Sequence, residues 1–261
     1  MNLEERTLVD LVIIFALSLT RVSSFVISSP MLGERSMPNT VKVAFCVAVG
    51  IFIFPGIERE FGTGASALDW RTSLVILGRE FIVGFTIGYL VRLVMLPARI
   101  AGSYMGQEFG FSLGQVADPS TGVASNEVRL LTDALALVLF WMTDSHHVAL
   151  RVLANQKIGD HLIEFPFTEV LGHTVSYVHQ VALQQIGPMV LALLLILVCL
   201  CVVMRSWSQM TLFLFGSGVR VLFGIGAFFV FVPWIVLQIS SWYRAMPDTL
   251  ARILFLSLIH I

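Results

Sequence analysis

The side chains in this sequence best suited to metal binding or acid–base chemistry are its histidines, and their spacing favours neither. His146 and His147 are adjacent, so on a continuous helix their side chains diverge by about 100°. His173 and His179 are six residues apart and also face different ways. Asp144 lies three residues before His147, where we expect a local hydrogen bond rather than a proton relay. We therefore predict no metal site, no cofactor and no catalytic residue, because nucleophile and phosphate-binding motifs are also missing from the sequence.

A second pattern is a run of small residues that recurs every four positions. Its members are Ala98, Gly102, Gly106, Gly110 and Gly114. On a helix this spacing forms a smooth groove that lets a neighbouring backbone approach closely. Each glycine also weakens the helix by up to about 1 kcal/mol relative to alanine, so the segment is able to bend. Gly84 and Gly88 repeat the spacing one helix earlier, and we interpret that pair as ordinary helix packing.

A polar turn follows this groove directly. Residues 115–122 contain Asp118 and Pro119, which begin a turn that continues through Ser and Thr to Gly122. The bulky apolar residues that precede the turn are Phe109, Phe111 and Leu113. At membrane depth such a turn is tolerated only where it is buried in protein or lines a cavity, as in loops that dip into a channel. An exposed turn between two helices explains the residue types equally well.

The composition indicates which elements must position these residues. Of 261 residues, 57% are hydrophobic and 13% are charged, whereas about a quarter of the residues of a soluble domain are charged. So few charges could not cover a water-facing surface, so we predict an all-α polytopic membrane protein that forms one domain over residues 1–261. We expect about six helices, several of them interrupted, at residues 8–29, 38–54, 72–97, 126–153, 187–204 and 219–240.

Charged residues interrupt most of these helices. Only residues 187–204 and 221–243 are free of charge and long enough to cross a bilayer. Arg21, Glu80 and Arg92 lie inside helices, where a charge at bilayer depth costs at least about 2.5–3.5 kcal/mol, and they are our candidates for buried charge pairing. An ion or proton path is the functional alternative. Because the three residues are scattered and form no chain, we favour salt bridges between this chain and other subunits.

The remaining sequence features exclude several classes of partner. The net charge of −1 suggests neither nucleic acid nor an anionic membrane surface as a partner. Cys199 and Cys201 point to nearly opposite sides of one apolar helix, and together with Cys46 they suggest no disulfide framework. The amino terminus has neither the basic region nor the small-residue cleavage site of a secretory signal, so we expect the first helix to be retained.

Several of these motifs, in this order, resemble the FliR family of flagellar export-gate proteins, which is related to the SctT proteins of virulence injectisomes. The adjacent histidines are similar to paired histidines of that family, and the groove followed by Asp118-Pro-Ser-Thr-Gly122 resembles its most specific motif. Resemblances nearer the amino terminus lie at Arg21-Val22, residues 30–38, Lys42, Pro55, Glu80, Gly84, Gly88 and Arg92. The resemblance covers nearly the whole chain. It departs at residues 205–220, where Gln209 and Arg220 fit but the family's Pro and Asn are missing.

The resemblance implies a structural subunit of a type III secretion export gate and no enzymatic activity. Such proteins join FliP- and FliQ-like subunits in a helical ring in the bacterial inner membrane, at the base of a flagellum or injectisome. An FlhB-like subunit wraps the gate, an FlhA-like export protein joins it, and unfolded proteins pass through. The loop after the glycine groove, about residues 106–125, lies in the pore as a plug. Carried over to this sequence, the plug residues are Phe109, Gly110, Phe111, Leu113, Asp118, Pro119 and Gly122.

Two other classes of function compete with this interpretation. A self-contained transporter would use broken helices as a substrate site, and inverted repeats between its halves would support it. We see no such repeats. A polytopic membrane enzyme would use His146, His147 and Asp144, and it would need further ligands that the sequence does not offer. Between the two secretion systems we favour the flagellum.

Overall fold

The computed structural model describes residues 3–30, 38–61, 69–108, 116–117, 124–125, 127–154, 167–204 and 212–248. These residues divide into two compact units. Unit 1 takes its residues from 1–93, 144–171 and 246–261, and unit 2 from 94–143 and 172–245. The chain therefore crosses from unit 1 to unit 2 inside a helix, and each unit is described by itself below.

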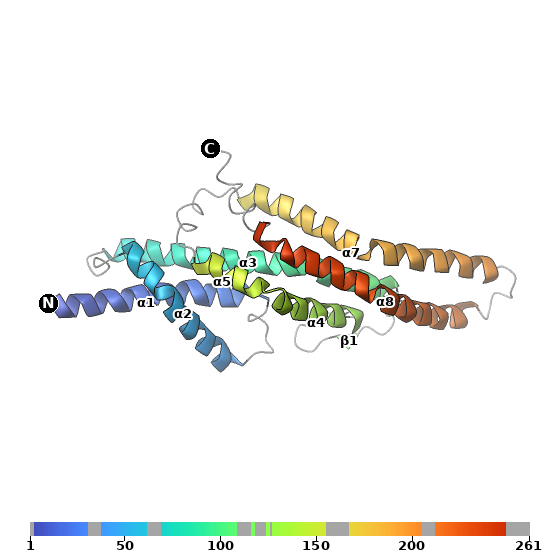
Figure 1. The fold of residues 1–261 in the computed structure, drawn as a ribbon, viewed down its shortest axis with the longest axis horizontal. Coiled ribbons are helices and arrows are strands. Elements are labelled where there is room, and N and C mark those ends of the chain that lie inside the picture. Colours follow the sequence, from blue (N-terminus) through green and yellow to red (C-terminus); the bar gives the residue numbers. More distant parts are fainter. Residues whose placement is uncertain are drawn as a thin grey trace. The chain divides into compact units, whose positions relative to one another are not determined.

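The described residues are helical apart from one short strand pair and the connections between elements, which confirms the predicted all-α class (Figure 1). The helices are α1 (Leu3–Ser28), α2 (Asn39–Phe61), α3 (Trp70–Glu108), α4 (Glu127–Met142), α5 (Ser145–Ala154), α7 (Phe167–Met204) and α8 (Leu212–Arg244). The strands are β1 (Val116–Ala117) and β2 (Ala124–Ser125), which pair antiparallel between α3 and α4.

Proline does not end the helices where we expected it to. The predicted end at Pro55 is wrong, because α2 continues to Phe61, and α3 likewise continues through Pro97 to Glu108. Helix α7 begins at Phe167 rather than at residue 187, with Pro188 in its interior. A proline removes one backbone hydrogen bond, but apolar helices tolerate that loss where neighbouring groups satisfy the freed carbonyl.

The predicted helix over residues 126–153 is two helices. Helix α4 ends at Met142 and α5 begins at Ser145. Asp144 between them has a φ of 55°, in the left-handed region that a continuous right-handed helix excludes. Asp is one of the few residues that enters this region readily, because its short side chain can form local hydrogen bonds there.

Five helices among the described residues are long and apolar enough to span a membrane, not the two that we expected. Their candidate spans are Leu8–Ser28, Asn39–Arg59, Trp70–Glu108, Val175–Ile196 and Val221–Arg244. The charges that led us to discount the first and third of these are buried against each other at Arg21 and Glu80. An internal charge therefore does not disqualify a helix when its partner lies in the same chain.

In unit 1, α2 packs across α1, and α1 runs alongside the first half of α3 (Figure 1). The α1–α3 contact depends on small residues. A Cβ at Gly84 would overlap the carbonyl oxygen of Arg21 and the hydroxyl of Ser24, and one at Gly88 would overlap the hydroxyl of Ser28. Because both sets of positions advance together along the chain, α1 and α3 are parallel. The interpretation of Gly84 and Gly88 as helix packing is confirmed.

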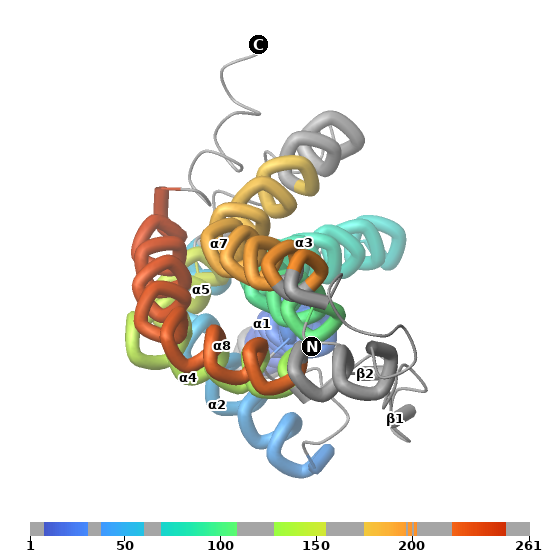
Figure 2. The backbone as a smooth tube through the Cα atoms, turned by 90° about the vertical axis from the view of Figure 1, so that its right-hand side faces the viewer, coloured from blue at the N-terminus to red at the C-terminus, as the bar shows by residue number. Residues whose placement is uncertain are grey.

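In unit 2, α4 lies against α8 (Figure 2). Aromatic residues join these helices, since Phe140 of α4 meets Tyr243 of α8 edge-on with ring centroids 5.6 Å apart. The indole of Trp242 donates a 2.8 Å hydrogen bond to the carbonyl oxygen of Val94 in α3. This carbonyl lies one residue beyond that of Leu93, which Pro97 deprives of its usual N–H donor. Trp242 thus supplies a donor at the point where α3 is weakened by its proline.

The α1–α3 contact generates a matched pair of variants on α3. Gly84→Ala inserts a methyl group where the backbone of Arg21 already lies, so we expect it to destabilise the fold by about 1–3 kcal/mol. Gly78→Ala is the control, because a Cβ there meets no atom within 4 Å and alanine favours the helix by up to about 1 kcal/mol. Thermal unfolding of the purified chain in detergent measures both. Equal unfolding temperatures for the two variants would contradict the observed packing.

Candidate functional site

The first part of the small-residue groove lies at the end of α3 that belongs to unit 2. Ala98, Gly102 and Gly106 are all buried there, on one face of the helix. A Cβ at Gly102 would overlap the hydroxyl of Thr132 in α4 and lie 3.0 Å from the Cα of Arg129. The absence of a side chain at Gly102 therefore lets α3 and α4 approach within backbone contact. Gly110 and Gly114 lie outside the described residues.

Thr132 fits this contact because its own polar group is already satisfied. Its hydroxyl donates to the carbonyl oxygens of Val128, at 2.7 Å, and Arg129, at 3.0 Å, both in its own helix. A buried hydroxyl without such a partner would cost free energy at membrane depth. Thr132 can thus pack against Gly102 without a hydrogen bond from its hydroxyl to α3.

Next to this contact, ion pairs join α3 and α4. Arg99 of α3 donates from Nε to both carboxylate oxygens of Asp133 in α4, at 3.1 and 3.3 Å. Arg129 lies one helical turn before Asp133, with its Nε 3.9 Å from the same carboxylate. We call Arg99, Gly102, Thr132 and Asp133 the α3–α4 clasp. It joins the two helices that precede and follow the predicted plug.

The plug itself falls mostly outside the described residues. The predicted plug residues that lie outside the described part of the chain are Phe109, Gly110, Phe111, Leu113, Asp118, Pro119 and Gly122. Their role stays a prediction. Within the plug the structure describes β1 and β2, in which Val116 is paired with Ser125 and Ala117 with Ala124. The four described residues of this segment are therefore paired antiparallel.

Two of the three candidates for buried charge pairing, Arg21 and Glu80, pair with each other. Arg21 of α1 and Glu80 of α3 are both fully buried and form an ion pair, with 2.5 Å between Nε of Arg21 and Oε2 of Glu80. The Nη1 of Arg21 also donates to the carbonyl oxygen of Leu153 in α5, at 3.4 Å. The other oxygen of Glu80 lies 3.3 Å from Nη2 of Arg79. This charge cluster holds three helices of unit 1 together.

Arg92 does not join that cluster. Its side chain is exposed on α3, and it forms no ion pair with any residue in the described part of the chain. The expectation that Arg21 and Glu80 pair with other subunits is wrong, because they pair with each other. It stays a prediction for Arg92 alone.

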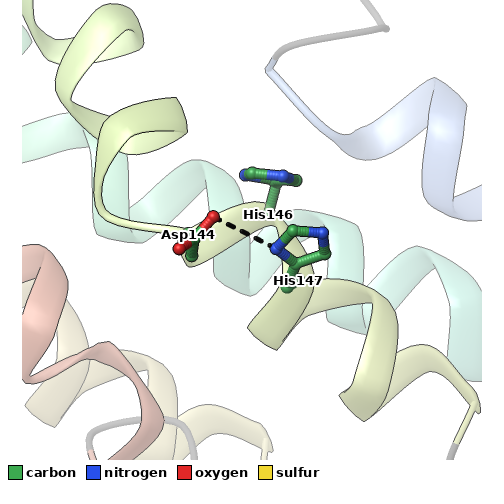
Figure 3. Close-up of side chains that lie close together, drawn as sticks. All are labelled: Asp144, His146 and His147. Carbon is green, nitrogen blue, oxygen red and sulfur yellow. Dashed lines mark hydrogen bonds and ion pairs between the residues drawn. The ribbon is translucent and has the colours of Figure 1, made fainter.

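The rings of the two adjacent histidines lie close together, whereas we expected them to diverge. The ring centroids of His146 and His147 are only 4.0 Å apart, and Nδ1 of His147 lies 3.2 Å from the Oδ1 of Asp144 (Figure 3). The expected Asp144–His147 hydrogen bond is confirmed. Burial lowers the pKa of His146, the nearby His147 lowers it further, and Asp144 opposes both effects. Our prediction of diverging rings is wrong although both residues lie within α5, because the step of about 100° fixes only the directions of the Cβ atoms and the two rings can still turn toward each other.

Sequence reasoning did not identify the Arg99–Asp133 pair. Asp133 is a charge within the predicted helix over residues 126–153, but nothing in the spacing connects it to a residue 34 positions earlier. Two signals could have found it. Arg99 is a charge next to the small-residue groove, and Arg129 and Asp133 are spaced as an i,i+4 ion pair whose carboxylate can serve a second cation.

Comparisons with known proteins agree with the sequence motifs. A family described as "Bacterial export proteins, family 1" matches residues 12–246. The flagellar biosynthetic protein FliR of Bacillus subtilis is 22% identical over 258 residues, which cover 96% of this chain and 98% of the relative. FliR of Caulobacter vibrioides is 24% identical over 91% of this chain and 95% of the relative. FliR of Escherichia coli is 23% identical over 90% of each.

The buried ion pair generates a test of the charge cluster. Glu80→Gln leaves the Arg21 guanidinium buried without its counter-ion, so we expect a loss of about 3–5 kcal/mol in the free energy of unfolding. The double variant Arg21→Met/Glu80→Met removes both charges, and we expect it to recover most of that loss. Arg92→Gln is the control on the same helix. Thermal unfolding in detergent and the amount of protein in membranes measure these effects. An unfolding temperature or a protein amount lower for the double variant than for Glu80→Gln would contradict the pairing.

Proposed function

We propose that this chain is a structural subunit of the flagellar export gate. It belongs to the bacterial export proteins of family 1, and within them to the FliR family. The observation that carries the proposal is the family match over residues 12–246, which spans both units. The five helices able to span a membrane agree with an integral membrane protein, which we assign to the bacterial inner membrane at the flagellar basal body. Its role there is structural rather than enzymatic.

The plug hypothesis is supported by how the chain frames residues 109–126. The α3–α4 clasp joins the helices on both sides of this segment, so its two ends are tethered near one another. The hypothesis also uses Gly106, Gly110 and Gly114, because glycine would allow the backbone to move when the plug is displaced. In the closed gate, the apolar bulk of Phe109 and Phe111 blocks ions by excluding water. An arriving unfolded protein pushes the segment aside while the clasp keeps its base in place.

The surface of the chain supports assembly with other membrane subunits. Large apolar side chains are strongly exposed on α2 and α8, among them Phe52 at 78%, Phe229 at 72% and Val230 at 74%. Lipid solvates apolar surfaces of this kind. It does not solvate the exposed charge of Arg92, which lies inside a candidate span. We assign this face of α3 to contact with FliP- and FliQ-like subunits in a helical ring. An FlhB-like subunit and an FlhA-like protein complete the pathway for unfolded substrates.

Deletion of the plug tests the proposed function most simply. Removing residues 110–122 should open the closed pore, so we expect the membrane of cells that carry the variant to leak ions. A potential-sensitive dye measures the leak. The control is the same deletion in cells that lack the FliP-like subunit, where no pore assembles and no leak is expected. If cells with the assembled variant stay tight while the variant accumulates normally, the plug assignment is wrong.

Loosening the clasp should have a smaller effect of the same kind. Arg99→Gln or Asp133→Asn removes one member of the α3–α4 ion pair, and we expect each to raise the ion leak above wild type but below that of the plug deletion. The double variant should leak no more than the worse single variant, because both changes break one interaction. Gln107→Ala, an exposed change near the end of α3, is the control. Strictly additive leaks would show that the two side chains act separately.

A further inference from the structure

A group of potential metal ligands lies apart from the clasp and the plug, at the break between α4 and α5. The backbone carbonyl of Asp144 accepts hydrogen bonds from the N–H groups of His147, at 3.0 Å, and Val148, at 3.4 Å, so Asp144 begins α5. His146 and His147 therefore lie in the first turn of a new helix. Their side chains and that of Asp144 gather on one side of the chain (Figure 3).

The separations of the donor atoms suit a small metal ion. One donor atom from each of Asp144, His146 and His147 lies within 4.8 Å of the other two. The 3.2 Å between Nδ1 of His147 and Oδ1 of Asp144 already matches one edge of a coordination shell. An ion about 2.1 Å from both atoms would hold them at an angle of about 100°, near the tetrahedral and octahedral values. A ring nitrogen of His146, which lies within 4.8 Å of both, would complete the set if its side chain rotated toward the ion.

The surroundings of these donors allow a hydrated ion to reach them. The side chains of His147 and Asp144 are 59% and 76% exposed. His146 is half-buried and its Nδ1 is covered, so its Nε2 would be the ligand. All three residues lie outside the candidate membrane spans. The left-handed backbone at Asp144 turns its carboxylate toward His147. All three residues belong to unit 1.

We propose that Asp144, His146 and His147 form a binding site for one divalent transition-metal ion, with water completing its coordination. Two imidazole nitrogens and a carboxylate favour zinc, nickel, cobalt or copper over magnesium and calcium, which prefer oxygen ligands only. The bound ion would fix the backbone at the α4–α5 break, because all three ligands lie within four consecutive residues. This role is independent of the proposed export function.

Titration of the full-length chain in detergent with Zn²⁺ and with Co²⁺ tests the site. The protein carries an affinity tag without histidine, and Cys199 and Cys201 are changed to serine because exposed thiols would also bind these ions. We expect one ion per chain, with visible Co²⁺ absorption that reports nitrogen and oxygen ligands. His146→Gln, His147→Gln and Asp144→Asn should each weaken binding by about 10- to 100-fold or more. Asn also tolerates the left-handed backbone, so the last variant keeps the fold of the break.

His179→Ala is the matched control, since it removes an exposed histidine from α7 and leaves the cluster intact. Stoichiometric binding that the three cluster variants weaken and His179→Ala does not would support the site. Binding that all variants share would show an adventitious site elsewhere. That result, or no binding of either ion, would overturn the proposal.

Discussion

Arg21 and Glu80 are fully buried in helices that are otherwise mostly apolar, and their ion pair is the constraint on which unit 1 depends. Either charge alone would be costly at membrane depth, so each requires the other at a fixed position. The same register places Ser24 against Gly84 and Ser28 against Gly88, one and two turns farther along α1 and α3. Charge pairing and close packing therefore specify a single alignment of these helices, and the bond from Arg21 to Leu153 adds α5 to it.

Unit 2 uses the same combination of a glycine contact and an ion pair, but with its charges half-exposed. Gly102 meets Thr132, while Arg99 meets Asp133. A partly exposed pair is worth less than a buried one, because water competes for both charges. Unit 1 thus has the rigid version of this contact. The weaker version lies beside the segment for which we propose movement, as expected if the clasp must hold the base of a plug without locking it.

Residue types and spacing were enough to predict the helical class, the role of Gly84 and Gly88, and the family. They failed where the outcome depends on three-dimensional neighbours. The predicted helices ended at Pro55 and Pro97 and began beside Pro188, yet α2, α3 and α7 continue through these prolines. Near Pro97 a tertiary hydrogen bond joins Trp242 to Val94, and no local pattern of residue types could have predicted it. No sequence period identifies the partner of Arg21 or of Arg99. The break at Asp144 depends on one left-handed residue, which Asp permits but does not require.

The central claim is that this chain works as one member of an assembly, with the face of α3 that carries Arg92 covered by other subunits. Native mass spectrometry of the chain extracted gently from its own membrane tests this claim most directly. We expect a particle that contains the chain together with several small hydrophobic subunits, and that stays intact after bound lipid is stripped away. A stable monomer or homodimer that retains transport activity would contradict it and would favour a self-contained transporter.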